Sequence, residues 1–182
     1  MHGIDSRRGF LLVFAGFPLS LTAGVDPPES LTSIEQRIFN AINFQRVSGD
    51  AGPLLWSAQL AATAREHSAR MLQAHFFGHE DPKYGNLSAR LSAAGVAYQR
   101  CGENVFREKN FDDPVSIAVV EWMYSQGHRE NLLLPQYTYT GVGAAANVDG
   151  TVAITQQFLD PPPSSYRDVI NGRGNPPGIR TK

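Results

Sequence analysis

Three short segments of the chain combine a glycine with side chains that can bind metals or transfer protons. They are Phe77-Gly78-His79, Gly102-Glu103-Asn104 and Ser125-Gln126-Gly127-His128-Arg129. Imidazoles and carboxylates are common ligands of zinc and common general acids and bases. We therefore expect His79, Glu103 and His128 to converge on one cleft, with Asn104 and Ser125 beside them.

Each of these side chains also has a structural interpretation. His79 can be a loop histidine bonded to backbone. Glu103 follows a glycine in an apolar, strand-like run, where a carboxylate is costly to bury unless it is paired; it can be a general base, orient a histidine, or tie a loop to the sheet. His128 follows Gly127, the expected end of a helix, and a helix C-terminus stabilises an imidazolium by about 0.3–1 kcal/mol. His67 lies on an apolar helical stripe and is expected to be a satisfied core histidine.

Other chemistry is weakly represented in the sequence. It contains no Gly-x-Ser-x-Gly, His-Glu-x-x-His or Cys-x-x-Cys motif, no phosphate loop and no dinucleotide fingerprint. Cys101 is the single cysteine, so it cannot form an internal disulfide. We expect a small buried residue in a strand, with an intermolecular bridge or a reactive thiol as alternatives. Glu121 is expected on a solvated helix face and Trp122 in the core.

The length of the chain indicates how many domains it forms, and its charge argues against one class of partner. The chain has 182 residues, a net charge of −1 and 18% charged residues. These values favour one domain, and the absence of a basic excess argues against nucleic acid as a partner.

The first residues predict export. Residues 1–23 join a basic segment with Arg7-Arg8 to an uncharged apolar stretch and a small-residue end, which is typical of a signal peptide of the twin-arginine kind. Retention as a membrane anchor is the alternative, but the apolar stretch is short and contains Pro18. We expect cleavage, no membrane span afterwards, and a secreted, periplasmic or cell-surface protein. A linker at 24–32, a domain at 33–160 and a disordered Pro/Gly-rich tail at 161–182 follow.

Hydrophobic periodicity and turn residues predict the elements of the domain. Ser33 and Gln36 suggest a capping box that opens a helix ending near Gly49. Further helices are expected from Trp56 onward, at 88–93, and from Asp113-Pro114 to Gly127. Extended segments are expected at 96–106, 139–147 and 151–158, the last two joined at Asp149-Gly150. This order favours an α+β sandwich with a mainly antiparallel sheet.

Taken together in order, these signals resemble the CAP superfamily, also called the SCP domain, in its short bacterial extracellular branch. The resemblance covers residues 34–158. It is carried by Ile42-Asn43-Phe44-Gln45-Arg46, Pro53-Leu54-Leu55-Trp56, His67-Ser68-Ala69-Arg70-Met71, Phe76-Phe77-Gly78-His79, Gly102-Glu103-Asn104, Trp122-Met123-Tyr124-Ser125-Gln126-Gly127-His128-Arg129, Gly141-Val142-Gly143 and Thr155-Gln156-Gln157-Phe158.

The resemblance implies a three-layer α/β/α sandwich and a secreted protein. It implies that His79 and His128 can hold a divalent cation such as zinc, with Glu103 as one glutamate of the cleft. The family's second glutamate falls at Ser125 in this chain, and the cysteine-rich extension of the family is missing.

Three functions follow from this comparison. The first is a binding or interaction module for a small apolar ligand, such as a sterol or lipid, or for an extracellular protein. The second is a metal-dependent, peptidase-like hydrolase with His79 and His128 as ligands and Glu103 as base. The third is a purely structural polar cluster. Catalytic zinc usually has three protein ligands, and Glu103 cannot be both ligand and base, so a binding module is favoured.

Overall fold

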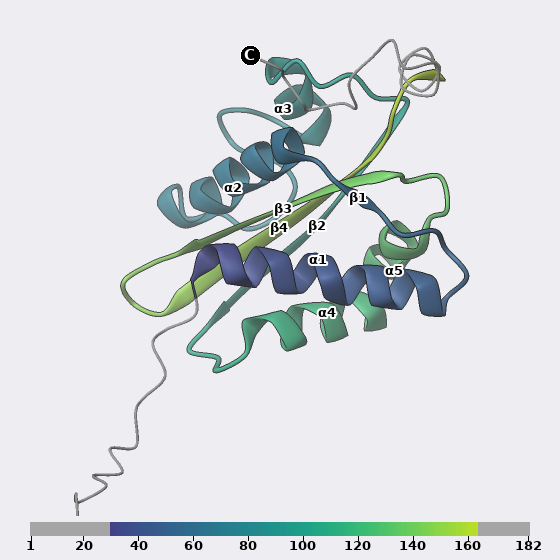
Figure 1. Ribbon diagram of the computed structural model, residues 1–182. Coiled ribbons are helices and arrows are strands. Elements are labelled where there is room, and N and C mark those ends of the chain that lie inside the picture. Colours follow the sequence, from purple (N-terminus) through teal and green to yellow (C-terminus); the bar gives the residue numbers. More distant parts are fainter. Residues whose placement is uncertain (1–29, 164–182) are drawn as a thin grey trace, which may run out of the picture.

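The structure, a computed structural model, describes residues 30–163 (Figure 1). The predicted export signal, most of the predicted linker and most of the predicted tail lie outside these residues. None of the helices in the described part is long and apolar enough to cross a membrane. In chain order the elements are α1 Leu31–Ser48, β1 Leu55–Trp56, α2 Ala58–Gln73, α3 Leu87–Ala93, β2 Arg100–Lys109, α4 Pro114–Tyr124, α5 Gln126–Leu133, β3 Tyr139–Ala146 and β4 Thr151–Asp160.

A four-stranded sheet forms the middle of three layers. Its strand order is β1-β3-β4-β2. The short β1 runs parallel to β3, whereas the β2–β4 and β3–β4 pairs are antiparallel. Helices α2 and α3 cover one face, and α1, α4 and α5 cover the other (Figure 1). The predicted α+β class with a mainly antiparallel sheet is therefore confirmed. The predicted β3–β4 turn is also present, with Gly150 at φ 83°.

The larger part of the core lies between the sheet and the layer of α1, α4 and α5. The central strands β3 and β4 are buried along most of their length, because helices cover both faces of the sheet. Trp122 anchors α4 to β2, because its indole N–H donates to the Val105 carbonyl at 3.0 Å. The cluster contains Ile34, Ile38, Ile42, Leu54, Phe106, Val115, Ala118, Val119, Trp122, Leu132, Tyr137, Val142, Ala144, Ile154 and Phe158.

On the opposite face, α2 lies directly against β3. A Cβ at Gly141 would come within 2.1 Å of the Ala61 nitrogen, and a Cβ at Gly143 within 2.0 Å of the Arg65 nitrogen. Only glycine permits this approach. Ser68 then bonds to β3 and β4 at once, since its hydroxyl donates to the Gly143 carbonyl and lies 2.8 Å from the Thr155 hydroxyl.

A buried arginine fixes the C-terminal end of α1. Arg46 is 0% exposed, and its guanidinium donates to four backbone carbonyls. Nε bonds to Gly52 at 2.7 Å, Nη1 to Leu132 and Leu134 at 2.7 and 3.1 Å, and Nη2 to Tyr137 at 3.2 Å. These carbonyls lie after α1 and in or after the last turn of α5, so one side chain holds the ends of both helices together.

Several element boundaries differ from the sequence prediction. The extended segment expected at 96–106 is β2, which spans Arg100–Lys109. α1 begins at Leu31, and Ser30, not Ser33, is its N-cap, because the Ser30 hydroxyl accepts from the Ser33 N–H. α4 ends at Tyr124, before Gly127, and a separate helix, α5, follows at once. The two-residue strand β1 was not predicted, because it is too short to show alternation.

Candidate functional site

The predicted cleft residues come from both helical layers and meet at the β2 edge of the sheet. His79 lies in the loop between α2 and α3, Glu103 on β2, and His128 in the first turn of α5. The His79 and His128 rings have centroids 6.5 Å apart, and Nδ1 of His79 lies 3.2 Å from Oε1 of Glu103. The structure thus places the three side chains side by side. The His79 side chain is 53% exposed, whereas that of Glu103 is 2% exposed.

Glu103 is the centre of this cluster. Nη2 of Arg90 donates to both carboxylate oxygens at 2.8 and 3.0 Å, and Nε2 of Gln157 donates to Oε2 at 3.1 Å. Gln157 faces Glu103 directly across the β2–β4 pair. Its own side-chain oxygen accepts from the Thr63 hydroxyl on α2. The buried carboxylate is therefore paired and hydrogen-bonded on each oxygen, as a buried charge requires.

These contacts determine the protonation of Glu103 and the tautomer of His79. Burial alone would raise the pKa of Glu103, but hydrogen bonds from His79 and Arg90 and the nearby positive charges hold it below its ordinary value. An ionised carboxylate can only accept, so Nδ1 of His79 carries the proton. In the neutral ring, Nε2 of His79 then keeps its lone pair. A carboxylate that orients a histidine in this way is the arrangement found behind metal-binding imidazoles.

His67 is buried as predicted, but it is not a fully satisfied core histidine. Its Nε2–H donates to the Gly78 carbonyl at 2.9 Å and lies 3.7 Å from Oε1 of Glu103. Its Nδ1 is buried without a hydrogen-bond partner. Burial is the largest cause that lowers the pKa of His67, and it outweighs the negative charge of Glu103. The ring therefore supports the loop that carries His79.

The surroundings of His128 correct the predicted helix-end interpretation. The residue lies in the first turn of α5, not after the end of α4, and the positive end of a helix dipole does not stabilise an imidazolium. Burial, and then the charge of His79, lower the pKa of His128. The Asn104 side chain donates to the His128 carbonyl at 3.1 Å, and Asn131 donates to the Asn104 side-chain oxygen at 3.0 Å. Asn104 is thus part of the site framework.

The remaining predicted residues lie at the margin. Ser125 is exposed between α4 and α5, where its side chain makes no capping hydrogen bond. Glu121 is exposed, as predicted. Cys101 is half-buried and is a free thiol, and burial raises its pKa, which lowers the thiolate fraction and with it the reactivity. Gly102 is required for packing, because a Cβ there would lie 2.4 Å from the Tyr137 hydroxyl.

Sequence reasoning missed three members of the cluster: Arg90, Gln157 and the role of His67. Arg90 is on a short helix between the exposed Ala89 and the buried Leu91, and nothing in its spacing marks it as buried. Gln156 and Gln157 gave a usable signal, because two adjacent amides in an otherwise apolar strand need internal partners.

The arrangement offers two imidazoles to a cation. Within residues 30–163, no group of three or more histidine, cysteine, aspartate or glutamate side chains is placed to hold a metal ion. The Glu103 carboxylate is hydrogen-bonded to Arg90, Gln157 and His79, so it can orient His79 but is not free to bind the cation. The donor set fits a cation held by His79 and His128 with water completing its coordination, and it lacks the third protein ligand usual in catalytic zinc sites.

The sequence and the fold are similar to those of known proteins. The sequence model of the cysteine-rich secretory protein family (CAP) matches residues 39–158. The chain is 32% identical over 132 residues to YkwD of Bacillus subtilis, spanning 72% of this chain and 49% of that protein. An extracellular protein with an SCP domain from Bacillus anthracis is 32% identical, with a TM-score of 0.60 over 70% of this chain and 40% of the other. An outer surface protein of Borrelia burgdorferi shares the fold at 14% identity, with a TM-score of 0.65 over 74% of this chain and 97% of the other. The chain thus spans half or less of the two Bacillus relatives.

Proposed function

Because the chain belongs to the cysteine-rich secretory protein (CAP) family, we propose that it is an exported bacterial binding or interaction module whose His79–Glu103–His128 cleft holds a divalent cation. The observation that carries the proposal is the 3.2 Å hydrogen bond between Nδ1 of His79 and Glu103. It leaves Nε2 of His79 as a metal-binding nitrogen and holds its ring in place.

The cation would be held by His79 and His128. Zinc suits imidazole ligands, and a bound cation would supply a positive charge and exchangeable water sites at the surface of the cleft. Glu103 would orient His79 and balance the charge of Arg90. Because the His79 side chain is half-exposed, a partner could reach the cation directly.

Export is supported by the sequence of residues 1–23 and by the Bacillus anthracis relative, which is described as extracellular. Its test is to express the full chain in a bacterium and locate it by cell fractionation. Replacing Arg7 and Arg8 by lysine should retain the protein in the cytoplasm if the twin-arginine route is used.

The hydrolase interpretation receives less support from the site. A general base works best when its pKa lies near the operating pH. Burial raises the pKa of Glu103, but hydrogen bonds from His79 and Arg90 outweigh this effect and hold the pKa below its ordinary value. Glu103 is also enclosed, with a 2% exposed side chain. We therefore propose binding and not hydrolysis as the role of the cleft.

The alternative proposal is that the protein binds a small apolar ligand, such as a sterol or fatty acid. A partly apolar groove of about 340 Å³ lies between α1 and α4, lined by Arg37, Asn40, Ala41, Val115, Ser116, Val119 and Val120. Binding of labelled sterol and fatty acid should be displaced by unlabelled lipid. A signal that resists this competition would reject lipid as the ligand.

Calorimetric titration with zinc tests the metal site. Wild type should bind one equivalent, and the His79→Ala/His128→Ala variant should bind at least about tenfold more weakly. His75→Ala is the matched control, because His75 is exposed at the end of α2 and outside the cleft. Equal affinity of the double variant and wild type would disprove the site.

A further inference from the structure

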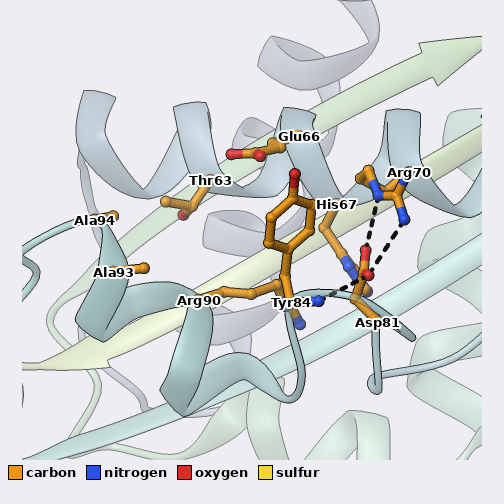
Figure 2. Close-up of a pocket in the computed structure, with 9 residues that line it drawn as sticks. All are labelled: Thr63, Glu66, His67, Arg70, Asp81, Tyr84, Arg90, Ala93 and Ala94. Carbon is orange, nitrogen blue, oxygen red and sulfur yellow. Dashed lines mark hydrogen bonds and ion pairs between the residues drawn. The ribbon is translucent and has the colours of Figure 1, made fainter.

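A second pocket lies between α2 and α3, and neither His79 nor His128 lines it. Its volume is about 160 Å³, and Figure 2 shows the side chains that line it. A cavity of about 150 Å³ accommodates a molecule of the size of benzene, so this pocket suits a small ligand of about that size or less. The lining residues are Thr63, Glu66, His67, Arg70, Asp81, Tyr84, Arg90, Ala93 and Ala94.

Arg90 contributes unused hydrogen-bond donors to this pocket. Only Nη2 of its guanidinium is engaged, with Glu103 and the His79 carbonyl. The side chain is only 8% exposed, and its Nε and Nη1 are buried without a hydrogen-bond partner. Buried N–H groups of a charged side chain are rarely left unpaired. The pocket therefore offers a place for an acceptor, of which a carboxylate is the strongest.

The charges around the pocket favour a ligand with charges of both signs. Arg70 pairs with Asp81 at 3.2 Å, and Arg90 is balanced by Glu103, which does not line the pocket. Glu66 adds a negative charge on the α2 wall. A simple anion entering next to Glu66 would be repelled. In Figure 2, Glu66 and Arg90 lie on opposite sides of the pocket, so each can face a different end of one small molecule.

We propose that this pocket binds a small zwitterion, namely a free amino acid with a short side chain. Its carboxylate would accept from Nε or Nη1 of Arg90, and its ammonium would face the Glu66 carboxylate. The side chain would pack against Ala93, Ala94 and the Tyr84 ring. This site is separate from the cation cleft, and its occupation does not depend on a metal there.

Tyr84 lies next to Arg90 in the lining of the pocket (Figure 2). The residue is 42% exposed and belongs to the loop before α3. It is held by cation–π contacts with Arg70 and Lys83, at 5.3 and 4.8 Å from the ring centroid. Such contacts are weak at exposed sites, so on this proposal the ring turns outward as the amino acid enters.

Matched ligands test the proposal on the folded full chain. L-valine, glycine and L-alanine are compared by calorimetry with isovalerate, which lacks the ammonium of valine, and with isobutylamine, which lacks its carboxylate. At least one amino acid should bind about tenfold or more tightly than both partial analogues. The Arg90 Nε–H signal in a nitrogen-15 spectrum should shift on binding. No binding by any amino acid, or equal binding by isovalerate, would overturn the proposal.

Two variants locate the site. Glu66→Gln should reduce amino-acid binding to about the level of the carboxylate-only analogue, whereas the exposed control Glu80→Gln should not. Ala93→Phe should fill the pocket and abolish binding, while Ser92→Phe, exposed on the same helix, should retain it. Both phenylalanine variants should bind zinc like wild type, which separates this pocket from the proposed cation cleft. Unchanged amino-acid binding in Ala93→Phe would place the ligand elsewhere and reject the pocket.

Discussion

Asn104 on β2 donates its side-chain amide to the backbone carbonyl of His128 in α5, at 3.1 Å. Asn104 and Glu103 are neighbours on β2, so they point to opposite faces of the sheet. One contacts the loop of His79, and the other holds the turn of His128. A single strand thus sets the positions of both histidines.

Asn104→Ala should loosen the start of α5. The change removes the donor to His128 and the acceptor for Asn131, and leaving buried polar groups unpaired costs about 1–3 kcal/mol. Urea unfolding should show this loss, and zinc affinity should fall by about tenfold. The exposed Asn40→Ala is the control and should change neither quantity. Unaltered zinc affinity in Asn104→Ala would show that β2 does not position His128.

Glu103→Gln should affect both stability and zinc binding. It leaves the buried Arg90 guanidinium without its carboxylate, and breaking a buried ion pair from one side costs about 3–5 kcal/mol. Loss of the partner behind His79 should weaken zinc binding by about 10–100-fold. Glu108→Gln changes an exposed residue of the same strand and serves as the control. If Glu103→Gln binds zinc like wild type, the carboxylate has no role in orienting His79.

Gly141→Ala should destabilise the contact between α2 and β3. The added methyl would lie 2.1 Å from the Ala61 backbone nitrogen, so the helix must move away from the sheet. Overpacking of this kind costs about 1–3 kcal/mol or more, measurable as a lower midpoint of thermal unfolding. Gly52→Ala adds the same methyl where no atom lies within 4 Å. A Gly141→Ala variant as stable as Gly52→Ala would contradict the close packing.

Arg46→Leu should be among the most destabilising single changes in the described part of the chain. It keeps an apolar side chain but removes the donors to four carbonyls of Gly52, Leu132, Leu134 and Tyr137. Several unpaired buried carbonyls together should cost about 3–5 kcal/mol. Arg100→Leu, at an exposed position, should lie within about 0.5 kcal/mol of wild type. Chemical unfolding of both proteins provides the comparison.

Acidification below about pH 6.5 should lower the free energy of unfolding. The unfolded chain takes up protons on His67 and His128 at the ordinary histidine pKa of about 6.5, whereas both folded-state pKa values are lowered. Between these values the unfolded state binds more protons, so stability rises with pH and levels off above about 6.5. Denaturant unfolding from pH 5 to 8 measures the slope. His128→Gln should reduce it, and the exposed-site control His75→Gln should leave it unchanged.

The helices with regular apolar spacing were predictable, because the isoleucines of α1 and the stripe of α2 repeat at the helical period. α5 was not, since its eight residues are mostly polar and the glycine within it suggested an end. Ser30 was missed as the N-cap because Ser33 and Gln36 match a capping box that begins three residues later. Within the cleft, adjacent glycines marked His79, Glu103 and His128. Arg90 and the unpaired nitrogen of His67 depend on tertiary burial, which spacing does not encode.

The cluster of His79, Glu103 and His128 is divided between the two helical layers, with His79 in the loop between α2 and α3 and His128 in α5. Neither layer carries the cluster alone, so a partly folded chain with only one layer docked cannot bring the two histidines together. A ligand bound there would stabilise only the completely assembled domain, and its occupancy would report that assembly had finished.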